Sequence, residues 1–159
     1  MKNKIRPTAW ICLILCVALA LSACGGSAAK SLDIAAFYEK LSGEFTLPEM
    51  MELSEKRMET YYGLSPDACR QLLARLNSDG QSVDEIWLIE AVDGKAAEEI
   101  QSLAEFRAEQ VRNETENYSP EQYAVAKEAR IIRDGNYVAL FISPDAGAMA
   151  ELFQKSLKS

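Results

Sequence analysis

Apolar residues recur along this chain with two different periods, and these periods predict a mixture of helices and strands. Helical spacing, with apolar residues three or four positions apart, occurs over residues 32–41 and 95–117. The longer of these two segments is the longest predicted helix, and glutamates line the side that carries few apolar residues. A last helix follows the Ser143-Pro144-Asp145 cap, where apolar residues keep the helical spacing: Met149, Leu152, Phe153 and Leu157.

Capping residues predict two further helices. Thr46 and Glu49 have the spacing of a capping box, and a proline in the first turn is tolerated, so a helix is predicted over residues 48–61. Ser119-Pro120-Glu121-Gln122 forms a second capping box, with proline at the first helical position. The helix that it opens is short and ends near Ala129.

Other segments have the pattern of strands. Residues 85–92 contain Ile86-Trp87-Leu88-Ile89, which is apolar at every position and predicts a central strand covered on both faces. Residues 130–142 predict a hairpin that turns at Asp134-Gly135 or at Gly135-Asn136. Either turn places the same apolar side chains on one core face: Ile131, Val138, Leu140 and Ile142.

Residues 65–76 fit both kinds of element. Ser65-Pro66-Asp67 is a good helix start, and Cys69, Leu72, Leu73 and Leu76 follow at helical spacing, so the periodicity alone favours a helix. The strands elsewhere are neighbours along the chain rather than separated by single helices. This order predicts the α+β class, with an antiparallel sheet packed against amphipathic helices.

The amino-terminal residues have the pattern of a signal peptide. Lys2, Lys4 and Arg6 precede an uninterrupted apolar run over residues 10–20, and no acidic residue occurs before Asp33. The run is about half of the roughly 20 residues that a membrane-spanning helix needs. Its length and its basic flank are those of a signal-peptide apolar region, with the charges staying on the cytoplasmic side.

Leu21-Ser22-Ala23-Cys24 follows this run and matches a lipobox at all four positions. In that motif the peptidase cleaves before the cysteine, whose thiol carries a diacylglyceryl group. The alternatives are an uncleaved membrane anchor and an ordinary secretory signal cut near Ala23. The lipobox divides the chain into a signal peptide (1–23), a flexible tether that starts at lipidated Cys24 (24–31) and a single domain (32–159). It predicts a protein anchored by lipid to the outer face of the cell membrane.

Net charge and the positions of the cysteines further limit the functions that this chain could have. The full chain carries a net charge of −7; without the three basic residues of the signal peptide, 14 basic residues stand against 24 acidic ones, and the charge is −10. This charge disfavours nucleic acid as a partner. The mature chain keeps one unlipidated cysteine, Cys69, for which a small core residue is a better interpretation than a reactive thiol. Since the chain has no histidine, Ser-His-Asp catalysis and histidine-ligated metals are excluded, and no cofactor or metal is expected beyond the lipid on Cys24.

Several short motifs, taken in order, resemble a family of bacterial lipoproteins classified as a domain of unknown function (DUF4358), common in clostridia and their relatives. The matching residues span roughly 37–153 and are Tyr62-Gly63-Leu64, Asp84-Glu85-Ile86, Asp93, Arg107, Gln110, Tyr118-Ser119-Pro120-Glu121 and Gly135-Asn136-Tyr137-Val138. The resemblance implies that residues 69–77 are a strand, paired through the Asp79-Gly80 turn with residues 85–92. The sheet would then have about four strands in two hairpins. The family has no established activity, so it assigns no catalytic residue.

Three functions are compatible with this sequence. The first is a lipid-anchored binding or accessory module for an envelope protein, recognised through the exposed side of residues 95–117 or the hairpin tip around Asp134. The second is a small enzyme that hydrolyses envelope carbohydrate with paired carboxylates, for which Glu85 and Glu90 are the candidates. The third is the solute-binding component of a transporter, although a single domain of this length is short for two lobes that close around a ligand.

Overall fold

The computed structural model describes residues 31–159, and Leu32–Ser159 forms one compact unit. The lipobox residues Leu21, Ser22, Ala23 and Cys24 therefore lie outside the described residues.

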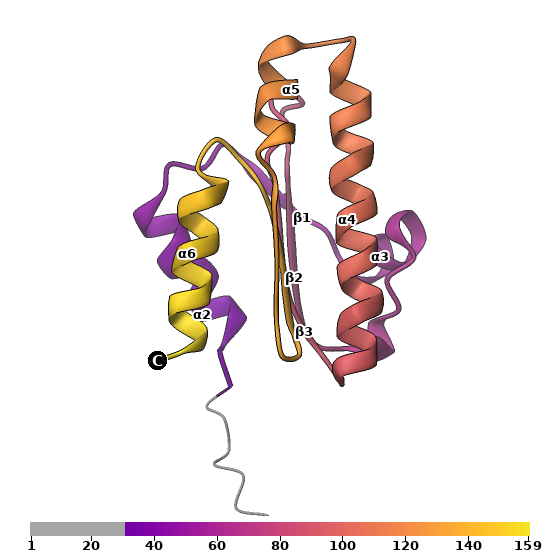
Figure 1. Cartoon of the computed structure of the whole chain (residues 1–159), viewed down its shortest axis with the longest axis vertical. Coiled ribbons are helices and arrows are strands. Elements are labelled where there is room, and N and C mark those ends of the chain that lie inside the picture. The colour runs from indigo at the N-terminus through magenta and orange to yellow at the C-terminus, as the bar shows by residue number, and fades with distance from the viewer. Residues whose placement is uncertain (1–30) are drawn as a thin grey trace, which may run out of the picture. The chain divides into compact units, whose positions relative to one another are not determined.

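A five-stranded antiparallel sheet, seen nearly edge-on in Figure 1, forms the centre of the 32–159 unit. Its strand order is β1-β2-β3-β5-β4. Its strands are β1 (Met50–Glu52), β2 (Cys69–Asn77), β3 (Glu85–Ala91), β4 (Arg130–Asp134) and β5 (Tyr137–Ile142). Strands β2 and β3 form one hairpin, and β4 and β5 form the other. The α+β class and the two predicted hairpins are confirmed, and β1 adds a fifth strand at the edge.

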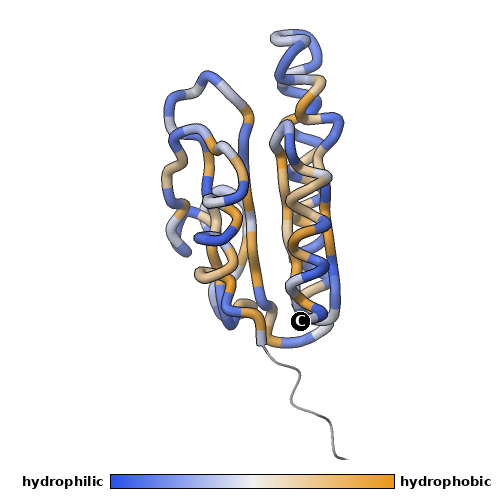
Figure 2. The backbone as a smooth tube through the Cα atoms, turned by 90° about the vertical axis from the view of Figure 1, so that its left-hand side faces the viewer, coloured by the Kyte–Doolittle hydropathy of each residue, from blue (hydrophilic) through white to orange (hydrophobic). Residues whose placement is uncertain are grey.

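Helices cover both faces of this sheet (Figure 1). On one face lie α2 (Ile34–Glu44) and α6 (Ala146–Leu157); on the other lie α3 (Glu55–Tyr62), α4 (Gly94–Glu116) and α5 (Pro120–Lys127). A short 3₁₀ turn, η2 (Pro66–Ala68), leads into β2. In Figure 2 the helices alternate between apolar and polar residues along their length, as expected for helices with one buried side.

The central strand β3 separates two apolar cores, and every one of its seven residues is buried. Trp87 and Ile89 face the core under α4, whereas Ile86 and Leu88 face the core under α2 and α6. Successive side chains of a strand point to opposite faces, so a segment apolar at every position fits only a strand covered on both sides. The prediction for residues 85–92 is confirmed.

The helix predicted over residues 48–61 is wrong in its first half. Met50–Glu52 is instead the edge strand β1, and α3 begins at Glu55 with Ser54 as its cap, whose hydroxyl accepts the Arg57 N–H at 3.4 Å. The Thr46/Glu49 spacing is a local signal. Pairing of β1 with the edge of β2 satisfies main-chain groups that a separate first helical turn would leave to solvent.

The helix favoured by periodicity for residues 65–76 is also wrong, and the strand implied by the family resemblance is confirmed as β2. Of the predicted helix, only the start at Ser65-Pro66-Asp67 is helical, and it forms the 3₁₀ turn η2. Leu72 packs against the core under α4 and Leu73 against the core on the opposite face. A strand buried on both faces, such as β3, needs a hydrogen-bonded neighbour on each side, and β2 supplies one of them.

The other helices and strands predicted for the described residues are present, with shifts of a few residues at their ends, although the Asp145 side chain makes no capping hydrogen bond at the start of α6. Asp93 caps α4, and its carboxylate accepts the Ala96 N–H at 2.8 Å. The Ser119 hydroxyl caps α5. The second hairpin turns at Gly135-Asn136, where Gly135 has a φ of 59° that favours glycine.

Candidate functional site

A buried ion pair joins the longest helix to the sheet. Glu85, the first residue of β3, is 0% exposed. Its carboxylate accepts a hydrogen bond from Arg107 Nε at 2.9 Å, and Arg107 Nη2 lies 2.9 Å from the same oxygen in the ion pair. The Trp87 indole N–H donates to the other carboxylate oxygen at 2.8 Å. The carboxylate is thus held by two hydrogen bonds and an ion-pair contact, and α4 is fixed against the sheet at Arg107.

Aromatic rings close this ion pair off from solvent. The Tyr62 ring packs edge-on against Trp87, with ring centroids 5.0 Å apart, and the Arg107 guanidinium lies 5.4 Å from the Tyr62 centroid. Burial raises the pKa of the Glu85 carboxyl, and this effect outweighs the opposing pull of Arg107 and the Trp87 hydrogen bond. One feature of the sequence is consistent with this arrangement: Arg107 falls on the apolar side of the helix predicted over residues 95–117.

A second polar cluster holds the start of the 32–159 unit. Gln71 donates to Glu90 at 2.6 Å and to the Leu32 carbonyl at 2.9 Å, and its side-chain oxygen accepts the Ile34 N–H at 3.2 Å. The Tyr137 hydroxyl accepts the Leu32 N–H at 2.9 Å. We call Gln71, Glu90 and Tyr137 the Leu32 clasp: Gln71 and Tyr137 bind the main chain at the start of α2, and Glu90 holds the Gln71 side chain.

Glu85 and Glu90 cannot act as paired carboxylates. Glu85 bonds to Arg107 on the α4 side of the sheet, whereas Glu90 joins the Leu32 clasp on the α2 side. An odd and an even position on one strand point to opposite faces, so the sheet itself separates the two groups. Glycoside hydrolysis needs both carboxyl groups beside one sugar, and this geometry rules the Glu85/Glu90 pair out for it.

Cys69 is half-buried at the start of β2, and among residues 31–159 it is the one cysteine. Burial, with a further contribution from the nearby Glu55 carboxylate, raises the pKa of the Cys69 thiol from 9.0 to about 11. At neutral pH the group is therefore the thiol rather than the nucleophilic thiolate. The interpretation of Cys69 as a packing residue agrees with this environment.

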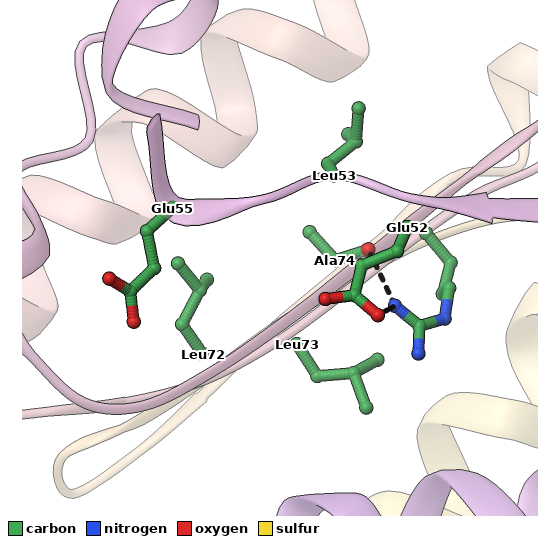
Figure 3. Close-up of a pocket in the computed structure, with 7 residues that line it drawn as sticks. Glu52, Leu53, Glu55, Leu72, Leu73 and Ala74 are labelled. Carbon is green, nitrogen blue, oxygen red and sulfur yellow. Dashed lines mark hydrogen bonds and ion pairs between the residues drawn. The ribbon is translucent and has the colours of Figure 1, made fainter. Parts of the chain in front are cut away.

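A notch of about 180 Å³ opens at the β1 edge of the sheet (Figure 3). It lies where the chain leaves β2 after Leu53 and turns into α3. Its lining consists of Glu52, Leu53 and Glu55 from one side and Leu72, Leu73, Ala74 and Arg75 from β2. Among the lining residues, Arg75 binds Glu52 at 2.8 Å, and its guanidinium lies 5.3 Å from the Tyr38 ring centroid.

The two faces singled out by the sequence are exposed but differ in character. The solvent side of α4 carries glutamates and one large apolar side chain, Phe106, which is 62% exposed. A shallow cavity of about 230 Å³ lies on its flank, between α4, α5 and β4. At the hairpin tip, Asp134 is exposed and has polar neighbours. Both cavities are smaller than the roughly 300–1,000 Å³ of typical small-molecule sites.

Metal ligands do not gather within residues 31–159: no three His, Cys, Asp or Glu side chains there are placed to hold an ion. In the same part of the chain, no helix has the length and apolar character to cross a membrane.

These features define a class: a three-layer α+β domain in which a buried ion pair ties α4 to the sheet and in which β1 covers only part of the outer edge of β2. The chain belongs to the family described as domain of unknown function (DUF4358), whose model matches residues 43–143. The matched region holds β1 to β5, both ends of the Glu85–Arg107 pair and the three side chains of the Leu32 clasp. Comparison of the chain with curated proteins and with solved structures gave no match.

Proposed function

We propose that this protein is a lipid-anchored accessory protein on the outer face of the cell membrane, where its folded unit binds an envelope protein. Leu21-Ser22-Ala23-Cys24 supports the anchor, because it places a cysteine after a small-residue cleavage site and a short apolar run. A diacylglyceryl group adds two acyl chains, and two chains hold a protein to a bilayer where one gives only marginal binding.

The observation that carries the proposal is the Leu32 clasp. In the proposed anchored form, a flexible chain of the length between Cys24 and Leu32 would reach roughly 15 Å. The clasp binds Leu32 through its N–H and its carbonyl at once, from β2 and β5. In a domain tethered at its first residue, any movement of the bound partner puts force on that residue. Side chains from the central sheet hold Leu32 against such a force better than helix α2 alone would.

Charge also fits this role. The mature chain would carry a net charge of −10, so anionic headgroups repel the folded unit and leave its surface free for a protein partner. The same charge disfavours nucleic acid. The geometry does not support the enzyme alternative, because the sheet separates Glu85 from Glu90. The solute-binding alternative needs two lobes that close around a ligand, whereas residues 32–159 form one compact unit.

The anchor is tested by replacing the proposed lipid-bearing residue, Cys24→Ser, in the full chain expressed in its own cells. We expect radiolabelled palmitate to be incorporated into the wild-type protein and lost from C24S, which also leaves the membrane fraction. Cys69→Ser is the matched control, since it removes a thiol that the proposal does not use. Equal labelling of wild type and C24S would overturn the anchor.

The partner is tested by mild crosslinking in the same cells, followed by mass spectrometry of what co-purifies. Recovery of one envelope protein at near-stoichiometric yield, above an unrelated lipid-anchored control, is the expected result. Recovery of nothing above that control would overturn the binding role.

A further inference from the structure

The edge of β2 that faces away from β3 is paired with β1 along only part of its length. The Asn77 N–H donates to the Asp84 carbonyl at 2.9 Å, so the odd-numbered β2 residues exchange hydrogen bonds with β3 and the even-numbered ones point to the other edge. On that edge β1 pairs with residues 75–77, and the last hydrogen bond runs from the Leu53 N–H to the Ala74 carbonyl at 3.0 Å. The chain then turns away into α3 at Ser54.

Leu72 is the next β2 residue whose main chain points to this edge. Among residues 31–159, no group bonds to its N–H or its carbonyl on that side. The notch lies at the same place, lined by Leu72 and Ala74 (Figure 3). An open strand edge beside a hollow of this size can accept main-chain hydrogen bonds and one or two side chains, which is what an added strand requires.

The side chains around the opening suit an extended segment with alternating residues. Leu72 faces the core under α4 and Leu73 the core under α2, and both remain half-buried. A strand laid along this edge would place its odd and even residues beside these two leucines in turn. In Figure 3 the Leu72 and Leu73 side chains leave β2 in different directions, with the Glu55 carboxylate beside Leu72.

Charge at the opening indicates which segment fits. Glu52 is neutralised by Arg75, whereas Glu55 makes no salt bridge within residues 31–159. Glu55 lies close enough to the start of β2 to affect the Cys69 thiol. A basic side chain on the incoming segment would therefore meet an unpaired carboxylate, and the negative charge of the whole unit favours a basic segment at longer range.

We propose that the open edge of β2 at Leu72 binds an extended, basic segment of the envelope partner by strand addition, with its apolar side chains entering the notch. This proposal rests on the binding role proposed above and not on the lipid anchor. A second copy of the chain is a poorer occupant. Twofold pairing of the same edge would bring two Glu55 carboxylates together between two negatively charged units.

The test uses the mature chain in detergent micelles and a pool of nine-residue peptides. The pool has valine at alternate positions and Lys, Glu, Thr or Ser at the others. We expect the protein to retain lysine-containing members over glutamate-containing ones, and the best member is then labelled for fluorescence anisotropy. Retention without preference for lysine, or no retention above a scrambled pool, would overturn the proposal.

Two pairs of variants separate strand addition from other contacts. Leu72→Pro removes the N–H that faces the open edge and leaves the hydrogen bonds between β2 and β3 intact, whereas Leu72→Ala removes the same side chain but keeps the N–H. We expect L72P to weaken peptide binding about tenfold or more, and L72A about threefold. Equal losses would show a side-chain pocket without strand addition.

The second pair tests the charge. Glu55→Lys reverses the carboxylate at the opening, and Glu59→Lys reverses an exposed one a turn further along α3. We expect E55K to abolish the preference for lysine and E59K to leave it unchanged. Since Glu55 is exposed and L72P alters the sheet, E55K keeps the test informative if L72P does not fold. A concentration-dependent dimer lost in L72P would instead assign the edge to a second copy.

The crosslinking experiment distinguishes the failure of this site from the failure of the proposed function. If L72P recovers the envelope partner as well as wild type does, the binding role stands and the strand site is overturned. If the partner is lost from L72P but kept by L72A, both proposals are supported. If no partner is recovered by any variant, the binding role itself fails.

Discussion

Arg107→Met is the substitution whose cost the structure defines best. Methionine keeps most of the length of the arginine side chain on α4 but removes its charge. Glu85 would then be a carboxylate with 0% exposure and a single remaining donor, the Trp87 indole at 2.8 Å. The hydrogen bond from Nε, the ion-pair contact of Nη2 (both 2.9 Å) and the contact with the Tyr62 ring would be lost with the guanidinium.

The size of the effect follows from this geometry. Removing one partner of a buried ion pair costs about 3–5 kcal/mol, because the other charge stays buried without compensation. For a domain of this length such a loss lowers Tm by about 10–20 °C. The double variant Glu85→Gln/Arg107→Met buries no charge, and its glutamine still accepts the Trp87 N–H. We expect it to recover about 2 kcal/mol of the loss, with one amide donor left unpaired.

The loss of stability caused by Arg107→Met should also depend on pH. Burial already raises the pKa of Glu85 above its ordinary value of 4.5, and removing Arg107 takes away the main effect that lowers it. A carboxyl with a raised pKa in the folded state contributes its stability below the unfolded pKa and loses it as pH rises through the folded pKa. The difference between R107M and wild type is therefore smallest below about pH 4.5 and grows toward neutral pH.

Thermal unfolding followed by circular dichroism, on the mature protein in detergent at a series of pH values, measures both effects. Lys95→Met is the matched control: it removes an α4 cation whose salt bridge to Glu99 lies on the exposed surface. A pH-independent loss in R107M, or a double variant that is no more stable than R107M, would refute the reasoning. Either result would mean that the loss of stability in R107M comes mainly from altered packing rather than from the unpaired buried charge.

Three further predictions concern the rest of the unit. Alkylation of Cys69 by iodoacetamide should keep accelerating up to about pH 11, and a plateau near pH 9 would contradict the burial of its thiol. Gly63→Ala should cost about 1 kcal/mol in urea unfolding, because Gly63 has a φ of 72°, whereas Gly43→Ala inside α2 should be neutral or stabilising. Tyr137→Phe should speed hydrogen exchange at the Leu32 amide, and unchanged protection there would argue against the clasp.

The layers of this fold could be predicted from residue patterns because each depends on local spacing. Ile86-Trp87-Leu88-Ile89 is apolar on both faces and could only be a covered strand. Gly135-Asn136 restricts the second hairpin to a narrow set of registers. The helix 95–117 is long enough for its apolar side to be unambiguous. In each case local preference and tertiary packing favour the same structure.

Residues 48–53 and 65–76 could not be predicted in this way. Both carry good helix signals, yet both form strands. Residues 50–52 pair with β2 further along the chain, and residues 69–77 pair with β1 on one side and β3 on the other. Leu72-Leu73 fits a helical side or the two faces of a strand equally well, and the need of β3 for a hydrogen-bonded neighbour decides between them. The polar contacts could not be predicted either, because their residues are far apart in the sequence. Glu85 and Arg107 are 22 residues apart, and Tyr137 binds the main chain of Leu32, 105 residues away.

The most direct test of the account is photocrosslinking in living cells from the open edge of β2. A photoreactive residue replaces Arg70, whose side chain is exposed on the unpaired part of β2, and matched controls replace Ser102 on α4 and Glu151 on α6. The account predicts one envelope protein crosslinked from position 70 alone, at a basic, extended segment. Crosslinks from Ser102 with none from Arg70 would contradict it and move the binding surface to α4.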